Sequence, residues 1–217
     1  MNSHPLISCL CIANGKPAFF DKALACFEKQ NYPNRELVVA YYKKDYHTQT
    51  VIEQSIKNHD SKIISVTYCS KESQGDIMKN AILKSTGFYL CNWNEEAWHH
   101  ESRLSYQYNS MQIVGERFKA SILSTIWIHD YQNSQSYLST SALWAETLLC
   151  RKEIVLTSWN AEDEVSPLKQ IIGLLSAKKM LYTIEKMPSL YIKAHHNEDT
   201  TSLLDENSNQ MIIALLS

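Results

Sequence analysis

Two groups of polar residues in this sequence have the types and spacing that metal or acid–base chemistry requires. The first is the segment NEEAWHH at 94–100, in which two glutamates follow an apolar run at 88–93. Carboxylates at the end of a strand commonly hold a hard cation such as Mg²⁺ or Mn²⁺. Asn94, Glu95 and Glu96 would also suit a solvated acidic turn, and the residue types alone leave both interpretations open.

The second group is the pair Glu162 and Asp163, which precedes a segment of helical character at 164–179. An Asp in this position is common as a helix N-cap. An ionised carboxylate can also take a proton as a general base. His195 lies in a later, distant segment and could join Glu96 on a metal ion, although a surface histidine is an equally good interpretation.

The elements that must position these residues alternate along the chain. Short apolar runs at 6–13, 36–42, 64–69, 88–93 and 120–128 predict strands, and the segments between them, at 18–30, 48–58, 75–86 and 101–117, predict helices. A polar turn is expected at 129–136. A strand-like piece follows at 146–154, then the helix at 164–179, then two short strands around Pro188.

This alternation predicts an α/β fold, with a mostly parallel sheet and helices on both of its faces. We expect a single domain over residues 1–217, because no linker or repeat divides the chain. Ligands of such sheets bind at the carboxyl ends of the strands. The segments to search are therefore 14–17, 41–45, 94–100 and the stretch near Asp163.

The composition excludes several classes of protein. The formal net charge is -2, so the chain lacks the basic excess of a general nucleic-acid binder. We expect no integral membrane segment and a cytoplasmic location, because the start lacks a signal-peptide core and no apolar stretch approaches bilayer length. The six cysteines form no C-x-x-C pair, which favours reduced thiols over a zinc site.

Several segments, taken in order, resemble family 2 glycosyltransferases, which have the Rossmann-like GT-A fold of the nucleotide-diphospho-sugar transferases. The resemblance covers residues 5 to about 200. It is carried by PLISCLCIANGKPAFFDKALACFEKQNYPNRELVVA, by GDIMKNAILKSTGFYLCNWNEEAWHHESRL, by WAETLLCRKEI with WNAEDEV, and by LYIKAHHNEDT.

The resemblance implies a sugar transferase that uses a nucleotide-diphospho-sugar donor and a carbohydrate or other hydroxyl acceptor. It implies a divalent metal, Mn²⁺ or Mg²⁺, with Glu96 as the carboxylate ligand, Asn94 as a neutral oxygen and His195 completing the site. It also implies inversion at the anomeric carbon, with Asp163 of the Glu162–Asp163 pair as the general base.

Donor recognition departs from the family pattern. Family members place aspartates at the end of the second strand, where this chain has Tyr41 and Tyr42, and Asn94 replaces the first Asp of the metal motif. Lys79 and Asn80 match a basic-plus-Asn pair that could contact the donor. These departures keep a second hypothesis open, a catalytically degenerate binding protein of the same fold. The sequence does not determine the oligomeric state.

Overall fold

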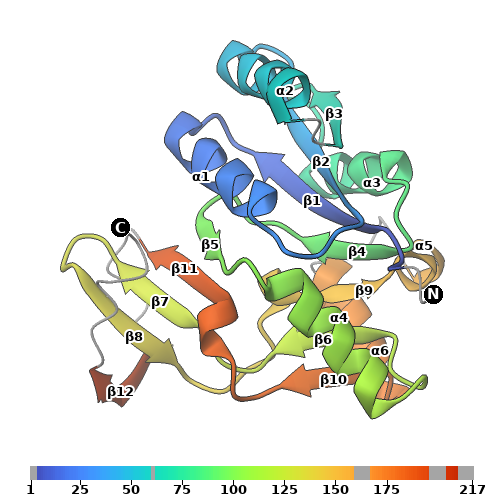
Figure 1. Ribbon diagram of the computed structural model, residues 1–217, viewed down its shortest axis with the longest axis vertical. Helices are drawn as coiled ribbons and strands as arrows, with labels where there is room; N and C mark the ends of the chain where they lie inside the picture. Colours follow the sequence, from blue (N-terminus) through green and yellow to red (C-terminus); the bar gives the residue numbers. More distant parts are fainter. Residues whose placement is uncertain (1–3, 60–61, 159–166, 196–203, 210–217) are drawn as a thin grey trace.

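In the described part of the chain, the main sheet has seven strands in the order β10-β6-β9-β4-β1-β2-β3. A computed structural model describes residues 4–59, 62–158, 167–195 and 204–209 (Figure 1). The strands of this sheet are β1 (Ile7–Ala13), β2 (Arg35–Tyr42), β3 (Ile63–Tyr68), β4 (Tyr89–Asn92), β6 (Ala120–Leu123), β9 (Leu149–Arg151) and β10 (Leu181–Ile184). Only β9 runs antiparallel to its neighbours, so the predicted mostly parallel sheet is confirmed.

Helices cover both faces of this sheet, as predicted. One face packs against α1 (Pro17–Glu28), α2 (Tyr46–His59) and α4 (Arg103–Val114). The other packs against α3 (Gln74–Lys84), α5 (Lys152–Ser158) and α6 (Pro167–Ala177). The central strands are apolar at nearly every position because both of their faces are buried. Among the described residues, no helix is long and apolar enough to cross a membrane.

A second, smaller sheet was not predicted. Its five strands have the order β12-β8-β7-β11-β5. They are β5 (Ala97–His99), β7 (Trp127–Asp130), β8 (Gln135–Ser139), β11 (Tyr191–His195) and β12 (Leu204–Asn209). In Figure 1 this sheet lies below α1, and its edge strand β5 is the strand nearest to that helix. The turn that follows β4 leads directly into β5.

Two strand predictions were wrong. The run at 120–128 is divided between β6 and β7, which belong to different sheets, because the chain bends at Ser124, directly after the last residue of β6 that pairs with β10. The expected turn at 129–136 is largely the β7–β8 hairpin. The run at 146–154 has only three strand residues, which lie between the 3₁₀ turn Ala145–Thr147 and α5.

A buried carboxylate joins the strands at the far end of the sheet. Glu36 in β2 is 0% exposed and accepts hydrogen bonds from Ser8 Oγ at 2.6 Å and from the backbone N–H of Thr86 at 2.6 Å. Lys62 Nζ lies 2.9 Å from its other oxygen. Glu36 thus connects β1, β2 and the segment that enters β4.

Candidate functional site

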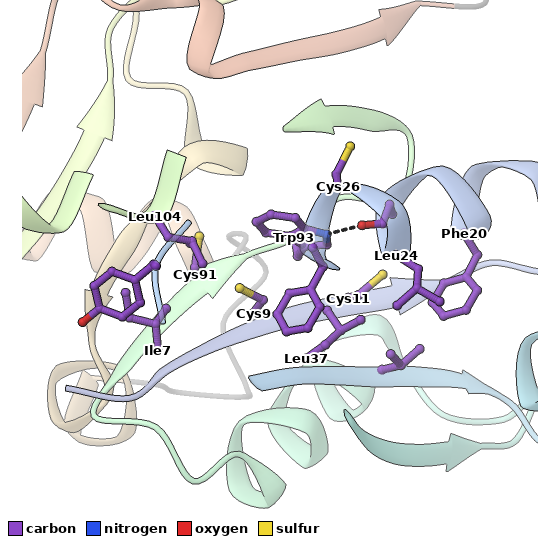
Figure 2. Packing of buried hydrophobic residues seen from close by; sticks show 14 of the residues in the cluster. Ile7, Cys9, Cys11, Phe20, Leu24, Cys26, Leu37, Cys91, Trp93 and Leu104 are labelled. Atoms are coloured by element: carbon purple, nitrogen blue, oxygen red, sulfur yellow. Dashed lines mark hydrogen bonds between the residues drawn. The ribbon is translucent and has the colours of Figure 1, made fainter. Parts of the chain in front are cut away.

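The acidic segment leaves the sheet at the carboxyl end of β4 and is anchored by Trp93. The backbone N–H of Trp93 donates to the carbonyl of Leu10 at 2.8 Å. Its indole Nε1 donates to the carbonyl of Ala23 in α1 at 3.0 Å, the dashed line in Figure 2. Trp93 is 0% exposed, so the core fixes the position at which the acidic turn begins.

Asn94 closes the turn with its own side chain. Its Oδ1 accepts the backbone N–H of Glu96 at 2.9 Å. Its carbonyl accepts the Nε2–H of His99 at 3.0 Å. The amide oxygen that the sequence suggested as a metal ligand is therefore engaged within the turn.

The two glutamates of the turn have different surroundings. Glu95 is 2% exposed; its Oε1 accepts the backbone N–H of Asn14 at 2.9 Å, while its Oε2 has no hydrogen-bond partner among the described residues. Burial raises the pKa of Glu95. Glu96 is more open and forms an ion pair with Lys16, and this contact raises the pKa of the lysine. The buried carboxylate with a free oxygen is thus Glu95, which the sequence did not single out.

A buried arginine side chain also holds the turn in place. Arg103 in α4 is 0% exposed and bonds to His99 Nδ1 and to the carbonyl of Asn92 at 3.1 Å. Because an arginine can only donate, Nδ1 of His99 must accept, and the ring proton lies on Nε2, facing Asn94. Burial and the charge of Arg103 hold the pKa of His99 well below its usual value, so this histidine stays neutral.

His99 is also fixed from the side, since its ring stacks on Trp93 with centroids 3.9 Å apart. His99 and Arg103 were missed at the sequence level. The i, i+4 spacing of a histidine and an arginine was a usable signal, but burial of the arginine depends on the tertiary packing of α4.

A groove of about 750 Å³ opens beside the acidic turn. One wall is the face of α1 that includes Phe19 and Lys22, and the opposite wall comes from the second sheet, with Trp98, Tyr131 and Ile192. Glu95 and Glu96 contribute to its lining. A bound molecule therefore reaches Glu96 directly, while the Glu95 carboxylate lies buried just behind it.

The second sheet also brings the segment of His195 toward the turn. Strand β11 pairs with β5, and the backbone N–H of Ala194 donates to the carbonyl of Glu96 at 3.2 Å. The side chain of His195 is outside what the structure describes, as are Glu162 and Asp163. Their roles remain predictions.

At the end of β2, the strand alternation separates the two tyrosines. Tyr41 is 5% exposed and packs into the core beneath α1, so the expectation that it contacts a donor needs correction. Tyr42 is half-buried, with its ring 6.1 Å from that of Tyr68 on β3. The hydroxyl of Tyr68 donates to the carbonyl of Ala13 at 3.1 Å. Tyr42 and Tyr68 therefore form the aromatic edge beside β1.

The remaining donor candidates, Lys79 and Asn80, lie on α3. Asp45, in the 41–45 segment that follows β2, caps α2 by accepting the backbone N–H of Thr48 at 3.1 Å, so its carboxylate already has a structural role. Lys79 is exposed on α3. Asn80 donates to Glu72 Oε1 at 3.4 Å.

The acidic turn has the donor set that a hard cation uses together with a phosphate ligand. Within the described ranges, no group of three His, Cys, Asp or Glu side chains could hold a metal by itself. Mg²⁺-type sites commonly use only one or two carboxylates and take further oxygens from substrate phosphates and water. The unpartnered Oε2 of Glu95 and the carboxylate of Glu96 fit that arrangement.

No protein-family model and no curated protein sequence matches the chain. Solved structures do match it. The mannosyltransferase PcManGT from Pyrobaculum calidifontis, in complex with GDP-Man and Mn²⁺, has a TM-score of 0.69 at 10% identity, over 92% of this chain and 59% of that one. S. aureus TarS 1–349 in complex with UDP has a TM-score of 0.65 at 10% identity, over 88% and 60%.

A third match is glucosyl-3-phosphoglycerate synthase from Mycobacterium tuberculosis, in complex with Mn²⁺, UDP and phosphoglyceric acid. Its TM-score is 0.59 at 10% identity, over 89% of this chain and 72% of that one. The chain spans about 60% of the length of the first two structures. At this level of identity the matches establish the fold, which is the GT-A type expected from the sequence.

Proposed function

We propose that this protein is a family 2 glycosyltransferase that transfers a sugar from a nucleotide diphosphate to an acceptor hydroxyl with the help of a divalent cation. One observation carries the proposal. A buried glutamate with an unpartnered oxygen, Glu95, lies beside Glu96 at the carboxyl end of β4 in a GT-A-type sheet, next to a groove of about 750 Å³.

The two glutamates would hold Mn²⁺ or Mg²⁺, which neutralises charge on the departing diphosphate. Glu95 is suited to this because its backbone contact with Asn14 fixes the carboxylate while Oε2 remains free. His99 and Arg103 keep the turn in place by bonding to backbone carbonyls on both sides of Trp93. His195, at the end of β11, is the candidate for a third protein ligand.

Asp163, with Glu162 beside it, is the proposed general base. An inverting displacement needs a group that removes the proton of the acceptor hydroxyl as it attacks the anomeric carbon. The support for this role is the order of the sequence motifs and the segment's position just before α6, which begins at Pro167. Both residues lie outside the described part of the chain.

Donor and acceptor would occupy different parts of the site. Tyr42 and Tyr68 offer an aromatic edge for a nucleobase, with Lys79 and Asn80 on α3 as further donor contacts. The groove suits a carbohydrate or another hydroxyl-bearing acceptor, because its lining includes aromatic rings such as Trp98 together with groups that can form hydrogen bonds.

The test is titration with several nucleotide sugars, with and without Mn²⁺, following thermal stability and release of nucleotide diphosphate. A bound donor at a hundredfold excess over its Kd should stabilise the protein by about 2.7 kcal/mol. Asp163→Asn should abolish turnover and keep donor binding. Turnover that survives in this variant would refute the assigned base, and failure of every donor to bind would refute the transferase.

A second function, a non-catalytic binding protein of the same fold, is favoured by three contacts. Lys16 pairs with Glu96, Asn94 bonds within its own turn, and Asp45 caps a helix. Each of these groups is thus satisfied without a donor. Donor binding without any release of nucleotide diphosphate would support this function over catalysis.

We also propose a cytoplasmic location. All six cysteines are free thiols, and Cys9 and Cys91 remain unbridged although they are register neighbours on β1 and β4. Free thiols fit a reducing compartment. Localisation of the full-length protein by fractionation, with a known cytoplasmic marker alongside, checks this directly.

A further inference from the structure

Lys16 occupies the place where the acidic turn meets the start of α1. It immediately precedes Pro17, the first residue of that helix, and its Nζ pairs with Glu96 across 80 sequence positions. The side chains of Lys16 and Glu96 are 49% and 32% exposed. Both therefore have room to exchange partners without rearrangement of the core.

The ion pair leaves the turn with an unbalanced negative charge. Glu95 lies directly beside Glu96, is 2% exposed and has an oxygen without a hydrogen-bond partner among the described residues. One ammonium therefore faces two carboxylates. A divalent cation would balance both, but it must compete with Lys16 for Glu96.

We propose that Lys16 is a built-in counter-ion that holds Glu96 in the cation-free protein and moves to the phosphates of a nucleotide diphosphate when Glu96 binds a divalent cation. Both halves of this inference rest on the proposed function, the first on its metal site and the second on its nucleotide-diphosphate donor. The side chain is long and flexible and carries a point charge, which suits exchange between a carboxylate and a phosphate oxygen.

The first half is tested with Mn²⁺ alone, by electron paramagnetic resonance titration of the full chain. Lys16→Met removes the competing charge and keeps most of the side-chain volume, so Mn²⁺ should bind about twofold to fivefold more tightly, the range expected for an exposed ion pair. Lys57→Met, an exposed lysine on α2, makes the same change in charge away from the turn and should leave the affinity unchanged.

A double-mutant cycle identifies the partner. In a Glu96→Gln background, Lys16→Met should no longer change the affinity for Mn²⁺, because the competition has lost its site. Unchanged or weaker Mn²⁺ binding by Lys16→Met in the wild-type background overturns the proposal. So does the absence of Mn²⁺ binding in both the wild-type protein and Lys16→Met.

The second half is tested with UDP and GDP at saturating Mn²⁺. Lys16→Met should weaken binding of the nucleotide severalfold although it strengthens binding of the metal, and Lys16→Arg should restore nucleotide binding. A purely structural lysine would not shift the two affinities in opposite directions. Equal nucleotide affinity in wild type and Lys16→Met overturns this half. If neither nucleotide binds the wild-type protein, the proposed function fails, while the Mn²⁺ titration still decides the exchange at Glu96.

Discussion

Replacing Glu36 with glutamine should destabilise the protein strongly, although this residue lies far from any proposed chemistry. Every group that contacts the carboxylate is a hydrogen-bond donor, and Thr86 contributes both its backbone N–H and its hydroxyl at 2.6 Å. Ser8 donates at 2.6 Å, and Lys62 lies 2.9 Å away. A glutamine side chain would turn an NH₂ group toward part of this set, so at least one donor loses its acceptor.

The magnitude follows from the pKa of Glu36. Burial alone would raise this pKa, but the hydrogen bonds from Ser8 and Thr86 and the contact with Lys62 outweigh burial and lower it from 4.5 to about 2. The side chain is 0% exposed, so solvent screens these contacts little. This difference in pKa corresponds to about 3 kcal/mol of folding free energy.

The sign of the pH dependence is fixed by the depressed pKa. The contribution of Glu36 is complete above pH 4.5, the ordinary value, and is lost as the pH falls toward 2, because the unfolded chain takes up the proton first. Urea unfolding followed by tryptophan fluorescence should therefore show a gap of about 3 kcal/mol between wild type and Glu36→Gln at neutral pH. The gap should shrink steadily in acid.

The matched control is Glu153→Gln. Its side chain is 64% exposed and faces Arg151 at 3.3 Å, so the same chemical change should cost less than about 1 kcal/mol. A Glu36→Gln variant as stable as this control at neutral pH would refute the reasoning. A gap that stays constant down to acid pH would show that the charge of Glu36 is not what stabilises the sheet.

Three further predictions concern packing and the acidic turn. Gly87→Ala should lower the free energy of unfolding, measured in urea, by several kcal/mol, because a Cβ there would lie 2.7 Å from the backbone nitrogen of Ser8, which cannot move aside. Unchanged stability would contradict this packing. Trp93→Phe should lower the free energy of unfolding by about 2 kcal/mol, since it removes the hydrogen bond to the carbonyl of Ala23 and leaves a void. A smaller loss would mean that the indole contact contributes little to stability. Glu95→Gln should weaken Mn²⁺ binding at least tenfold by calorimetry while the fold, checked by circular dichroism, is kept; equal affinity would exclude Glu95 as a ligand.

The strands at the centre of the molecule could be predicted because they are buried on both faces. The runs LISCLCIA and ELVVAYY are mostly apolar at consecutive positions, a pattern typical of a parallel strand that is covered on both faces. Alternation with helical segments then limits the connections to parallel crossovers. The acidic segment could also be predicted to lie at the edge of the sheet, because it directly follows such a strand.

The second sheet and the partners within the site were decided by tertiary structure. Strands of three to six residues, such as β5 and β7, are too short to have a clear periodicity and gain their hydrogen bonds from distant segments. Strand alternation places Tyr41 and Tyr42 on opposite faces of β2, but the packing of the core decides that Tyr41 is buried and Tyr42 only half-buried. The assignment of one domain to residues 1–217 remains a prediction.

By itself, the sequence determined which residues carry charge and which strand they follow, since both are local properties. It could not determine that Glu95 would be buried with a free oxygen or that Lys16 would reach Glu96 from 80 positions away. Those facts depend on how the β1–α1 corner packs against the turn after β4. Long-range register and packing set that geometry, and neither can be read from a window of neighbouring residues.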